Sequence, residues 1–315
     1  MIKPVITGSF FDFKHHSAFD GKYWVDKTAL FTDEDWKLKI REMKELGIDT
    51  VVIMAVSLHG KSFFKSKLFP KYEIKATDAL KAVLEQAGEL NMNVFVGVGW
   101  VTEQCVDYPT EDWQVEKSEK LIKELDEGYG GLKAFKGWYI PYESGIKSYF
   151  EELCVDKLEK ITRYIKTISK KPVLIAPYVT GQPVNDEKYI SQLQRLGVDI
   201  VAYQDSIGVR WRKPEDTTSM YKNLKEIHDK TNIKLWTDLE VFEFEGDVYK
   251  SGLIPADIER IKKQLVNEAP FVEKILCYQV HGLMDKPGSK KPLGVFAAQK
   301  LYADYQKYRK GDATQ

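Results

Sequence analysis

The fold of this chain is decided by residues Lys234–Glu243, KLWTDLEVFE, which begin like a buried β-strand. Successive side chains of a strand point to opposite faces, so Trp236, Asp238 and Glu240 share one face. Carboxylates inside a core cost several kcal/mol unless they are paired or serve a function. We therefore interpret this stretch as the seventh strand of a (βα)8 barrel, with Glu240 as half of a catalytic pair. The alternative is that Asp238 and Glu240 lie in an exposed loop or face water from an edge strand.

The composition is that of a soluble globular protein, with 315 residues, 43% hydrophobic and 30% charged. Lys+Arg and Asp+Glu both total 47, and this balance argues against a general nucleic-acid-binding protein, which needs a basic surface. We expect no transmembrane segment, because the chain contains no apolar run of about 18 residues. The N-terminus does not resemble a secretory signal, so a cytoplasmic location and export with the signal already removed both stay open. Composition says nothing about the oligomeric state.

No cofactor or metal is expected from the sequence motifs. The three cysteines, Cys105, Cys154 and Cys277, have no CxxC spacing, which argues against a zinc site or a disulfide framework, although one bridge stays possible. His15 and His16 are adjacent and are best interpreted as loop histidines. The chain also lacks both a GxGxxG after the first strand and a GxxxxGK[ST], so nothing indicates a bound nucleotide.

Strand and helix patterns alternate eight times along residues 1–315 without an obvious linker or repeat. Such alternation predicts parallel strands, and eight units of this size favour a single-domain (βα)8 TIM barrel over an open sheet. The expected strands are 5–13, 50–56, 93–99, 134–143, 171–178, 198–205, 234–243 and 274–279. The expected helices are 32–46, 76–90, 110–125, 150–168, 186–196, 215–231, 255–269 and 293–308.

Polar and aromatic residues gather where the predicted strands end, and this is the face of a TIM barrel that carries the active site. Aromatic rings stack on sugar rings and amides bind hydroxyl groups, so such a rim suits a glycan. We expect the catalytic carboxylates to be Glu143 and Glu240. The expected substrate contacts are Asp12, His59, Trp100, Tyr139, Tyr142, Tyr178, Tyr203, Gln204, Asp205, Trp236, Asp238, Tyr278 and Gln279.

Hydrolysis of a glycosidic bond needs one carboxylic acid to protonate the leaving oxygen and a second carboxylate to attack or to activate water. Strands four and seven lie across the barrel mouth from each other, so Glu143 and Glu240 are placed to flank a bond. We assign Glu143 as acid/base, with its pKa raised by the neighbouring aromatic rings, and Glu240 as a nucleophile kept ionised by hydrogen bonds. The alternative for Glu143 is a helix-capping or loop carboxylate.

Two further carboxyl groups near this pair have more than one interpretation. Asp205 either binds sugar or caps the turn formed by residues 206–208. Asp238 is interpreted as an orienting partner of the pair or as a substrate contact.

Five segments of the chain resemble a bacterial barrel family, of the Bacteroides type, that is classed as glycosidase-like but has no characterised function. They are ITGSF at 6–10, GWYIPYE at 137–143, APY at 176–178, DIVAYQD at 199–205 with Gly208, and LWTDLEVF at 235–242. The glutamates of strands four and seven are also similar to those of retaining TIM-barrel glycoside hydrolases, although Tyr142 stands where those enzymes have asparagine. The resemblance implies a carbohydrate-active barrel with an oligosaccharide or glycoside substrate.

Other functions stay open beside the hydrolase. A non-catalytic carbohydrate-binding barrel would have the same aromatic rim without turnover. A metal-dependent enzyme using Asp12, His59, Asp205 and Asp238 is disfavoured, because no HxH or HExxH spacing occurs and the chain has 5 histidines in all. The sugar, the linkage, endo or exo action, and retention or inversion of configuration are not predicted.

Overall fold

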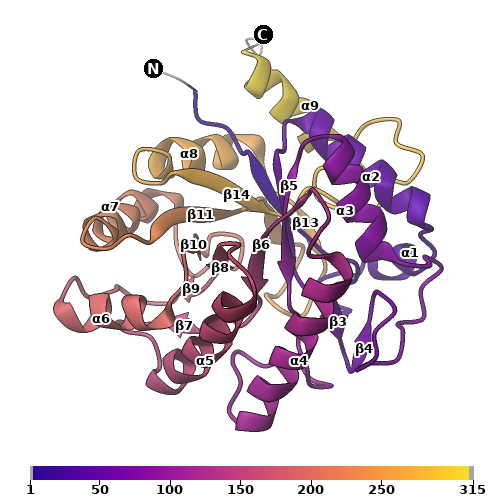
Figure 1. Cartoon of the computed structure of the whole chain (residues 1–315). Helices are drawn as coiled ribbons and strands as arrows, with labels where there is room; N and C mark the ends of the chain where they lie inside the picture. Colours follow the sequence, from indigo (N-terminus) through magenta and orange to yellow (C-terminus); the bar gives the residue numbers. More distant parts are fainter. Residues whose placement is uncertain (1–2, 312–315) are drawn as a thin grey trace.

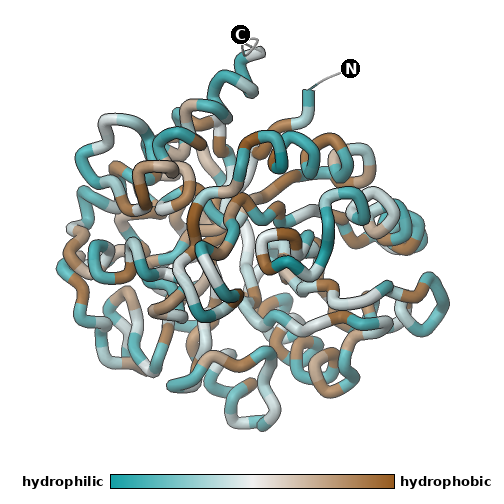
Figure 2. The backbone as a smooth tube through the Cα atoms, turned by 180° about the vertical axis from the view of Figure 1, so that it is seen from behind, coloured by the Kyte–Doolittle hydropathy of each residue, from teal (hydrophilic) through white to brown (hydrophobic). Residues whose placement is uncertain are grey.

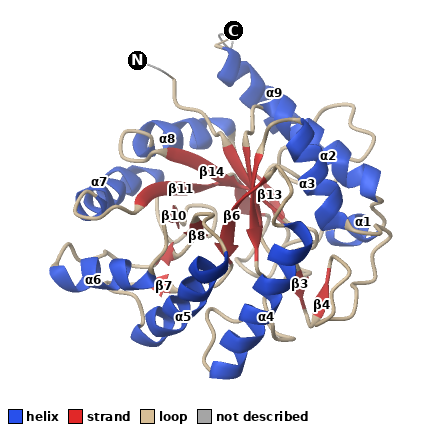
Figure 3. Cartoon of the chain, viewed as in Figure 1, coloured by secondary structure: helices blue, strands red, loops and turns tan. Residues whose placement is uncertain are grey.

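The computed structural model describes residues 3–311 and shows eight parallel strands in a nearly closed barrel with helices around it (Figures 1 and 3). The strands pair in the order β1-β2-β5-β6-β8-β10-β11-β14, which follows the order of the chain. The predicted (βα)8 architecture is therefore confirmed. The barrel strands are β1 Gly8–Phe11, β2 Thr50–Ile53, β5 Asn93–Gly97, β6 Phe135–Ile140, β8 Val173–Ile175, β10 Ile200–Gln204, β11 Lys234–Glu240 and β14 Lys274–Tyr278.

The helices form the outer layer, and in Figure 2 their backbone alternates between hydrophilic and hydrophobic colours. This alternation is expected of helices that bury one stripe against a sheet and leave the other in water. The helices are α1 Val25–Ala29, α2 Asp33–Leu46, α3 Ala79–Glu89, α4 Asp112–Tyr129, α5 Glu152–Ile168, α6 Glu187–Leu196, α7 Thr217–His228, α8 Ile258–Glu268 and α9 Phe296–Lys310, with a 3-10 turn η1 at Pro214–Asp216.

The barrel closes between its first and last strands. The backbone N–H of Thr7 donates to the carbonyl of Ile275 at 3.0 Å, which joins the segment before β1 to β14. The backbone N–H of Ile6 donates to the hydroxyl of Tyr305 at 2.7 Å, so α9 is fastened over the same seam. These contacts join residues that are separated by almost the whole length of the chain, and they hold the two ends of the barrel sheet together.

Helix boundaries follow capping residues, with one correction to the prediction. Thr32 and Asp35 form the reciprocal capping box at the start of α2, and Gly47 ends that helix with φ of 101°. The helix after β11 was expected to begin at Pro255, and this prediction of the helix start is wrong. Pro255 ends a short strand, and the helix begins later, where Asp257 accepts a hydrogen bond from the backbone of Glu259.

Short additional strands follow several of the barrel strands. The hairpin of β12 and β13 comes directly after β11, and it was not predicted. A second small hairpin lies in the long loop after β2, and two further strands pair beside β10. These strands are β3 Ser57–Leu58, β4 Lys61–Ser62, β7 Gly145–Ile146, β9 Tyr178–Val179, β12 Phe242–Phe244 and β13 Leu253–Pro255.

Aromatic side chains contribute to the packing inside the barrel. Phe10 meets Tyr139 edge to face at 5.4 Å between ring centroids, and Phe95 meets Trp236 in the same way at 5.8 Å. Trp236 is 8% exposed and has the ammonium of Lys274 5.8 Å from its ring centroid. Trp236 is therefore part of the packed interior.

No helix within residues 3–311 is long and apolar enough to cross a membrane. The three cysteines all belong to the described part of the chain and are free thiols, with Cys154 and Cys277 buried.

The close approach of β2 and β5 provides a test of the packing. A Cβ added at Gly97 would lie 2.2 Å from the carbonyl oxygen of Ile53, and this backbone atom cannot move aside. We expect Gly97→Ala to lower the free energy of unfolding by roughly 2–4 kcal/mol in chemical denaturation. Gly131→Ala is the matched control, since no atom lies within 4 Å of its added Cβ. Equal stability of the two variants would contradict this account of the strand packing.

Candidate active site

A cavity of about 370 Å³ opens where the barrel strands end, and it has the size of a small-ligand site. Five carboxyl groups line it, from Asp20, Asp107, Glu143, Asp238 and Glu240. Among the described residues that line the cavity there is no lysine or arginine. The site is therefore acidic, and it suits uncharged or cationic ligands better than anionic ones.

Glu143 lies three residues beyond the end of β6 and is half-buried at the cavity wall. The hydroxyl of Tyr139 donates to Glu143 Oε1 at 3.1 Å, and the amide of Gln204 also hydrogen-bonds to this carboxylate. Both bonds favour the ionised form, but burial outweighs them and raises the pKa of Glu143 to about 7. The group can therefore hold a proton near neutral pH and release it, as a general acid must.

Glu240 ends β11 and is 2% exposed. Its Oε2 accepts the backbone N–H of Val209 at 3.0 Å, and the N–H of Gly208 also donates to the carboxylate. The expected hydrogen bonds are thus present, but the prediction that they keep Glu240 ionised in the free protein is wrong. Burial, followed by the charge of Asp205, outweighs them and raises the pKa of Glu240 to about 8 in the empty site. The carboxylate is desolvated, which makes its negative charge sensitive to any positive charge brought into the cavity.

The turn that reaches Glu240 depends on two backbone features. Ser206 adopts a positive φ of 59°, which is uncommon for a residue with a side chain. At Gly208 an added Cβ would lie 2.6 Å from the carbonyl oxygen of Phe242, so only glycine fits there. The turn after β10 is therefore pressed against the segment after β11, with the N–H of Val209 directed at Glu240.

Asp205 lies behind Glu240 and is fully buried. Its carboxylate accepts the backbone N–H groups of Ile207 at 3.2 Å and Glu240 at 3.3 Å, and the side-chain amide of Gln264 at 2.5 Å. The structure thus shows the turn-capping alternative for Asp205 rather than a position on the cavity wall. Asp205 acts on Glu240 through the backbone and through its charge.

A second layer of polar groups continues outward toward α8. Glu268 is fully buried and accepts a hydrogen bond from the hydroxyl of Thr237 at 2.7 Å, and burial raises its pKa well above the usual value. Arg260 donates to the carbonyl groups of Glu240 and Phe242 at 2.8 and 2.6 Å. This guanidinium is the positive charge that most directly opposes Asp205 and Glu240.

Asp238 lines the cavity beside Glu240 and is 3% exposed. Its Oδ1 is buried without a hydrogen-bond partner, and burial together with the charges of Glu240, Asp205 and Glu143 raises its pKa well above the usual value. An unpartnered buried oxygen on a cavity wall is costly unless a ligand satisfies it. Asp238 is therefore placed to contact a ligand hydroxyl.

Aromatic rings form a continuous series along the cavity wall. Neighbouring rings of Tyr178, Trp211, Tyr249, Phe244 and Phe242 have centroids 5.4 to 6.3 Å apart. Trp211 and Tyr249 are 49% and 51% exposed, so their faces are open to solvent at the cavity mouth. The mouth of the cavity therefore combines exposed aromatic rings with carboxyl groups.

The two loops that carry these rings are joined by Arg210. Its guanidinium donates to the carbonyl of Gly246 at 3.0 Å and to that of Phe244 at 2.7 Å. The loop after β10 and the β12–β13 hairpin therefore form one wall.

The structure brings six of the expected residues to the cavity and places the others elsewhere. Glu143, Tyr178, Gln204, Asp238, Glu240 and Tyr278 line it. The side chains of Asp12, Tyr139 and Gln279 lie beneath it. Tyr139 bonds to Glu143, and Asp12 accepts hydrogen bonds from Tyr278 at 2.7 Å and Gln279 at 3.3 Å.

Two of the expected tyrosines point away from the cavity, which corrects the prediction that they contact substrate. The hydroxyl of Tyr203 lies 3.2 Å from that of Tyr189 and 3.1 Å from Nε2 of His228, both on outer helices. The hydroxyl of Tyr142 lies 3.5 Å from Ser118 on α4. Each tyrosine neighbours a residue that does face the cavity, so alternation along the chain directs it to the opposite side.

The remaining expected contacts are also outside the cavity wall. Trp236 packs inside the barrel, as described above. His59 is exposed in the β3–β4 hairpin, with its Nδ1 3.4 Å from the hydroxyl of Tyr72. Trp100 is 6% exposed and donates from Nε1 to the carbonyl of Val106 at 3.0 Å.

Several cavity residues were not identified from the sequence, and most of them lie in loops. They include His15, His16, Asp20, Asp107, Trp211 and Tyr249. The one available signal was their position after predicted strands, where barrel loops carry function. Loop residues have no periodicity that would show which of them turn inward.

Comparison with known families gives a clear match. The family described as "Domain of unknown function (DUF4434)" matches residues 6–291. The chain belongs to this family. A comparison with curated protein sequences finds no match.

Several solved structures have folds similar to that of this chain. One is described as a "putative alpha-L-fucosidase" from Bacteroides thetaiotaomicron, with a TM-score of 0.75, 20% identity, and coverage of 98% of this chain and 96% of that one. An endo-beta-1,4-mannanase from Thermotoga petrophila has a TM-score of 0.58 at 11% identity, covering 100% and 79%. The catalytic domain of an endoglucanase from Xanthomonas campestris has a TM-score of 0.60 at 11% identity, covering 98% and 95%. The fold is thus that of TIM-barrel glycoside hydrolases.

The burial of Glu240 predicts a pH dependence of stability. The pKa of Glu240 is about 8 in the folded chain against an ordinary 4.5, so the folded state keeps a proton that the unfolded state releases. Stability therefore falls as pH rises between these values. We expect Glu240→Gln to be more stable than the wild type at pH 8.5 by roughly 1–2 kcal/mol, or several degrees in Tm, and to lose this advantage at pH 5.

Thermal denaturation from pH 5 to pH 9 measures this difference. Glu103→Gln, at an exposed position, is the control for replacing a glutamate by glutamine. Parallel stability curves for the wild type and Glu240→Gln would contradict the burial cost assigned to this carboxyl.

Proposed function

We propose that this protein is a glycoside hydrolase in which Glu143 is the general acid/base and Glu240 the nucleophile. The observation that carries the proposal is that one cavity contains both glutamates together with an open series of aromatic rings. The glycoside hydrolases among the similar folds support a carbohydrate substrate. The lack of lysine and arginine among the described lining residues favours an uncharged glycan.

Each glutamate has an environment that suits its proposed role. Glu143, with a pKa near 7, keeps a proton available for the leaving oxygen while Tyr139 and Gln204 hold the carboxyl in place. The carboxyl group of Glu240, at the end of β11, is held by the backbone N–H of Val209 in the turn after β10. The oxocarbenium-like transition state brings positive charge next to this desolvated carboxylate, which favours its ionised form when it is needed.

The other cavity groups are assigned to substrate binding. Asp238, with its unpartnered Oδ1, accepts a hydrogen bond from a sugar hydroxyl. Tyr178, Trp211 and Tyr249 stack on the sugar rings at the mouth.

Substitution of the two glutamates tests the chemical roles. We expect Glu240→Gln to lower kcat by roughly 10³-fold or more, and Glu143→Gln to lower it by roughly 10²–10⁴-fold on unactivated glycosides but far less on activated aryl glycosides. The wild-type rate should peak near pH 7–8, between the pKa values of the pair. Glu143→Gln should lose the decline at alkaline pH, because that limb reports loss of the Glu143 proton.

A panel of glycans and aryl glycosides supplies the substrates for these kinetics. Full activity of both variants would refute the assignment of Glu143 and Glu240 as the catalytic pair. Saturable glycan binding by the wild type without any turnover would instead identify a carbohydrate-binding barrel.

Substitution of Trp211 tests the stacking surface. We expect Trp211→Ala to raise KM roughly three- to tenfold with little change in kcat, since the ring binds ground state and transition state alike. Trp113→Ala is the matched control, because Trp113 has a similar exposure of 51% but lies on α4 outside the cavity wall. An unchanged KM in Trp211→Ala would remove this ring from the binding site.

A further inference from the structure

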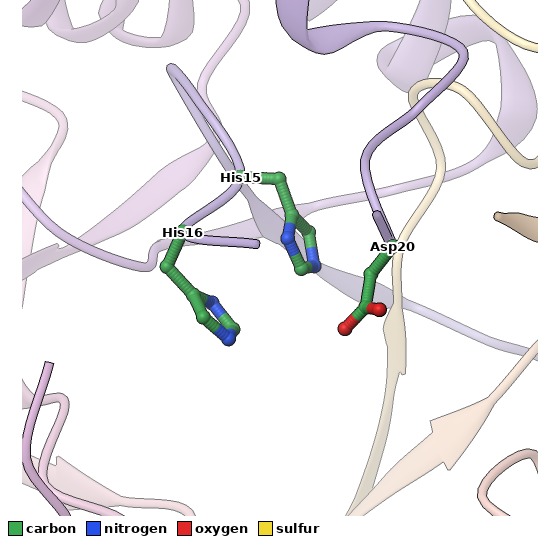
Figure 4. Close-up of side chains that lie close together, drawn as sticks. All are labelled: His15, His16 and Asp20. Atoms are coloured by element: carbon green, nitrogen blue, oxygen red, sulfur yellow. The ribbon is translucent and has the colours of Figure 1, made fainter. Parts of the chain in front are cut away.

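The loop after β1 places three potential metal ligands together on the cavity wall. Nitrogen atoms of His15 and His16 and a carboxylate oxygen of Asp20 all lie within 4.8 Å of one another. Figure 4 shows the three side chains directed toward a common space, with the ring of His15 between the other two. The proposed glycosidase chemistry uses none of these residues.

The backbone of this loop is held firmly, so the cluster is a built feature. The backbone N–H of Asp20 donates to Ser17 Oγ at 3.2 Å, and the carbonyl of Asp20 accepts the N–H of Leu253 at 3.0 Å. The N–H of Gly21 donates to the carbonyl of Ser17 at 3.0 Å. The loop is thereby tied to the β12–β13 hairpin, which also lines the cavity.

Asp20 provides independent evidence that this place can hold a ligand. The residue is 5% exposed, and its Oδ1 is buried without a hydrogen-bond partner. A buried oxygen of this kind carries an uncompensated desolvation cost, and a cation would offset it. Burial accordingly raises the pKa of Asp20 to about 6.

The two histidines supply the nitrogen atoms of the cluster, because one ring nitrogen of each belongs to the group of ligand atoms that lie within 4.8 Å of one another. Nδ1 of His15 lies 3.0 Å from the carbonyl oxygen of Ser17 and at the same distance from the backbone nitrogen of Ser17, whose N–H points at it, so the loop backbone holds this nitrogen. Metal binding through Nε2 requires the tautomer in which Nδ1–H donates to the carbonyl of Ser17.

We propose that His15, His16 and Asp20 form a binding site for a divalent cation of the zinc type on the cavity wall. Two imidazoles and one carboxylate suit Zn²⁺, whereas Mg²⁺ and Ca²⁺ prefer all-oxygen sites. Three protein ligands leave a fourth position, which opens into the cavity and is available to water or to a hydroxyl of a bound molecule. The five carboxyl groups around the cavity add a field that attracts cations.

Binding requires a small contraction of the cluster. Bonds of about 2.0–2.1 Å place tetrahedral zinc ligands about 3.4 Å apart, against separations of up to 4.8 Å here. The contraction falls on the side chain of His16, which is exposed, while those of His15 and Asp20 are buried.

The experiment is a metal titration of the full chain without an affinity tag, after removal of bound metals by a chelator. Isothermal titration with Zn²⁺ should show one site with Kd in the micromolar range or lower, and Mg²⁺ should show none. Co²⁺ should give the visible absorption of a tetrahedral nitrogen and oxygen site.

Two variants locate the site, and a third controls for the acidic cavity. Asp20→Asn and His16→Ala should each weaken Zn²⁺ binding by at least tenfold, and both should fold, because the first is isosteric and the second changes an exposed side chain. Asp107→Asn removes a different carboxylate of the same cavity and should bind like the wild type. The proposal is overturned if Zn²⁺ does not bind below millimolar concentration, or if Asp20→Asn and His16→Ala bind it as tightly as the wild type. These results do not depend on whether the protein hydrolyses glycans.

Discussion

The buried contact between Asp205 and the end of β11 is the constraint on which the cavity depends. One carboxylate accepts N–H groups from the turn after β10 and from Glu240, together with the amide of Gln264 on α8. It therefore fixes two strands and a helix relative to one another. The same contact places a second negative group behind Glu240, so the electrostatics and the geometry of the site have a common origin. The rest of the barrel supplies the stability that holds these like charges together.

Much of the fold could be predicted because it depends on periodic patterns. The alternation of strands and helices led to the barrel, and the capping pair of Thr32 and Asp35 located α2. The period of two also placed Asp238 and Glu240 on one buried face, and both line the cavity. The same period separates Tyr203 from Gln204, although both were expected to contact substrate. Consecutive residues of a strand cannot both face the axis, so only Gln204 reaches the cavity.

The rest of the site could not be predicted because it lies in loops. Trp211 and Tyr249 take their positions from Arg210, whose hydrogen bonds join segments more than 30 residues apart. His15 and His16 are adjacent in sequence, which in a strand would separate them, but in the loop their rings stack with centroids 4.6 Å apart. Tertiary contacts decide such positions, and local sequence carries no trace of them.

The β12–β13 hairpin has a consequence for how this family can diversify. It connects β11 to α8 and contributes Phe242, Phe244, Tyr249 and Leu253 to the cavity wall, while the carboxyl-bearing strand beneath it belongs to the barrel. Insertions, deletions or exchanges of aromatic residues in this one segment would reshape the mouth without altering the strand pairing below. The shape of the cavity mouth can thus change in one segment of the chain, and the barrel does not have to be rebuilt each time.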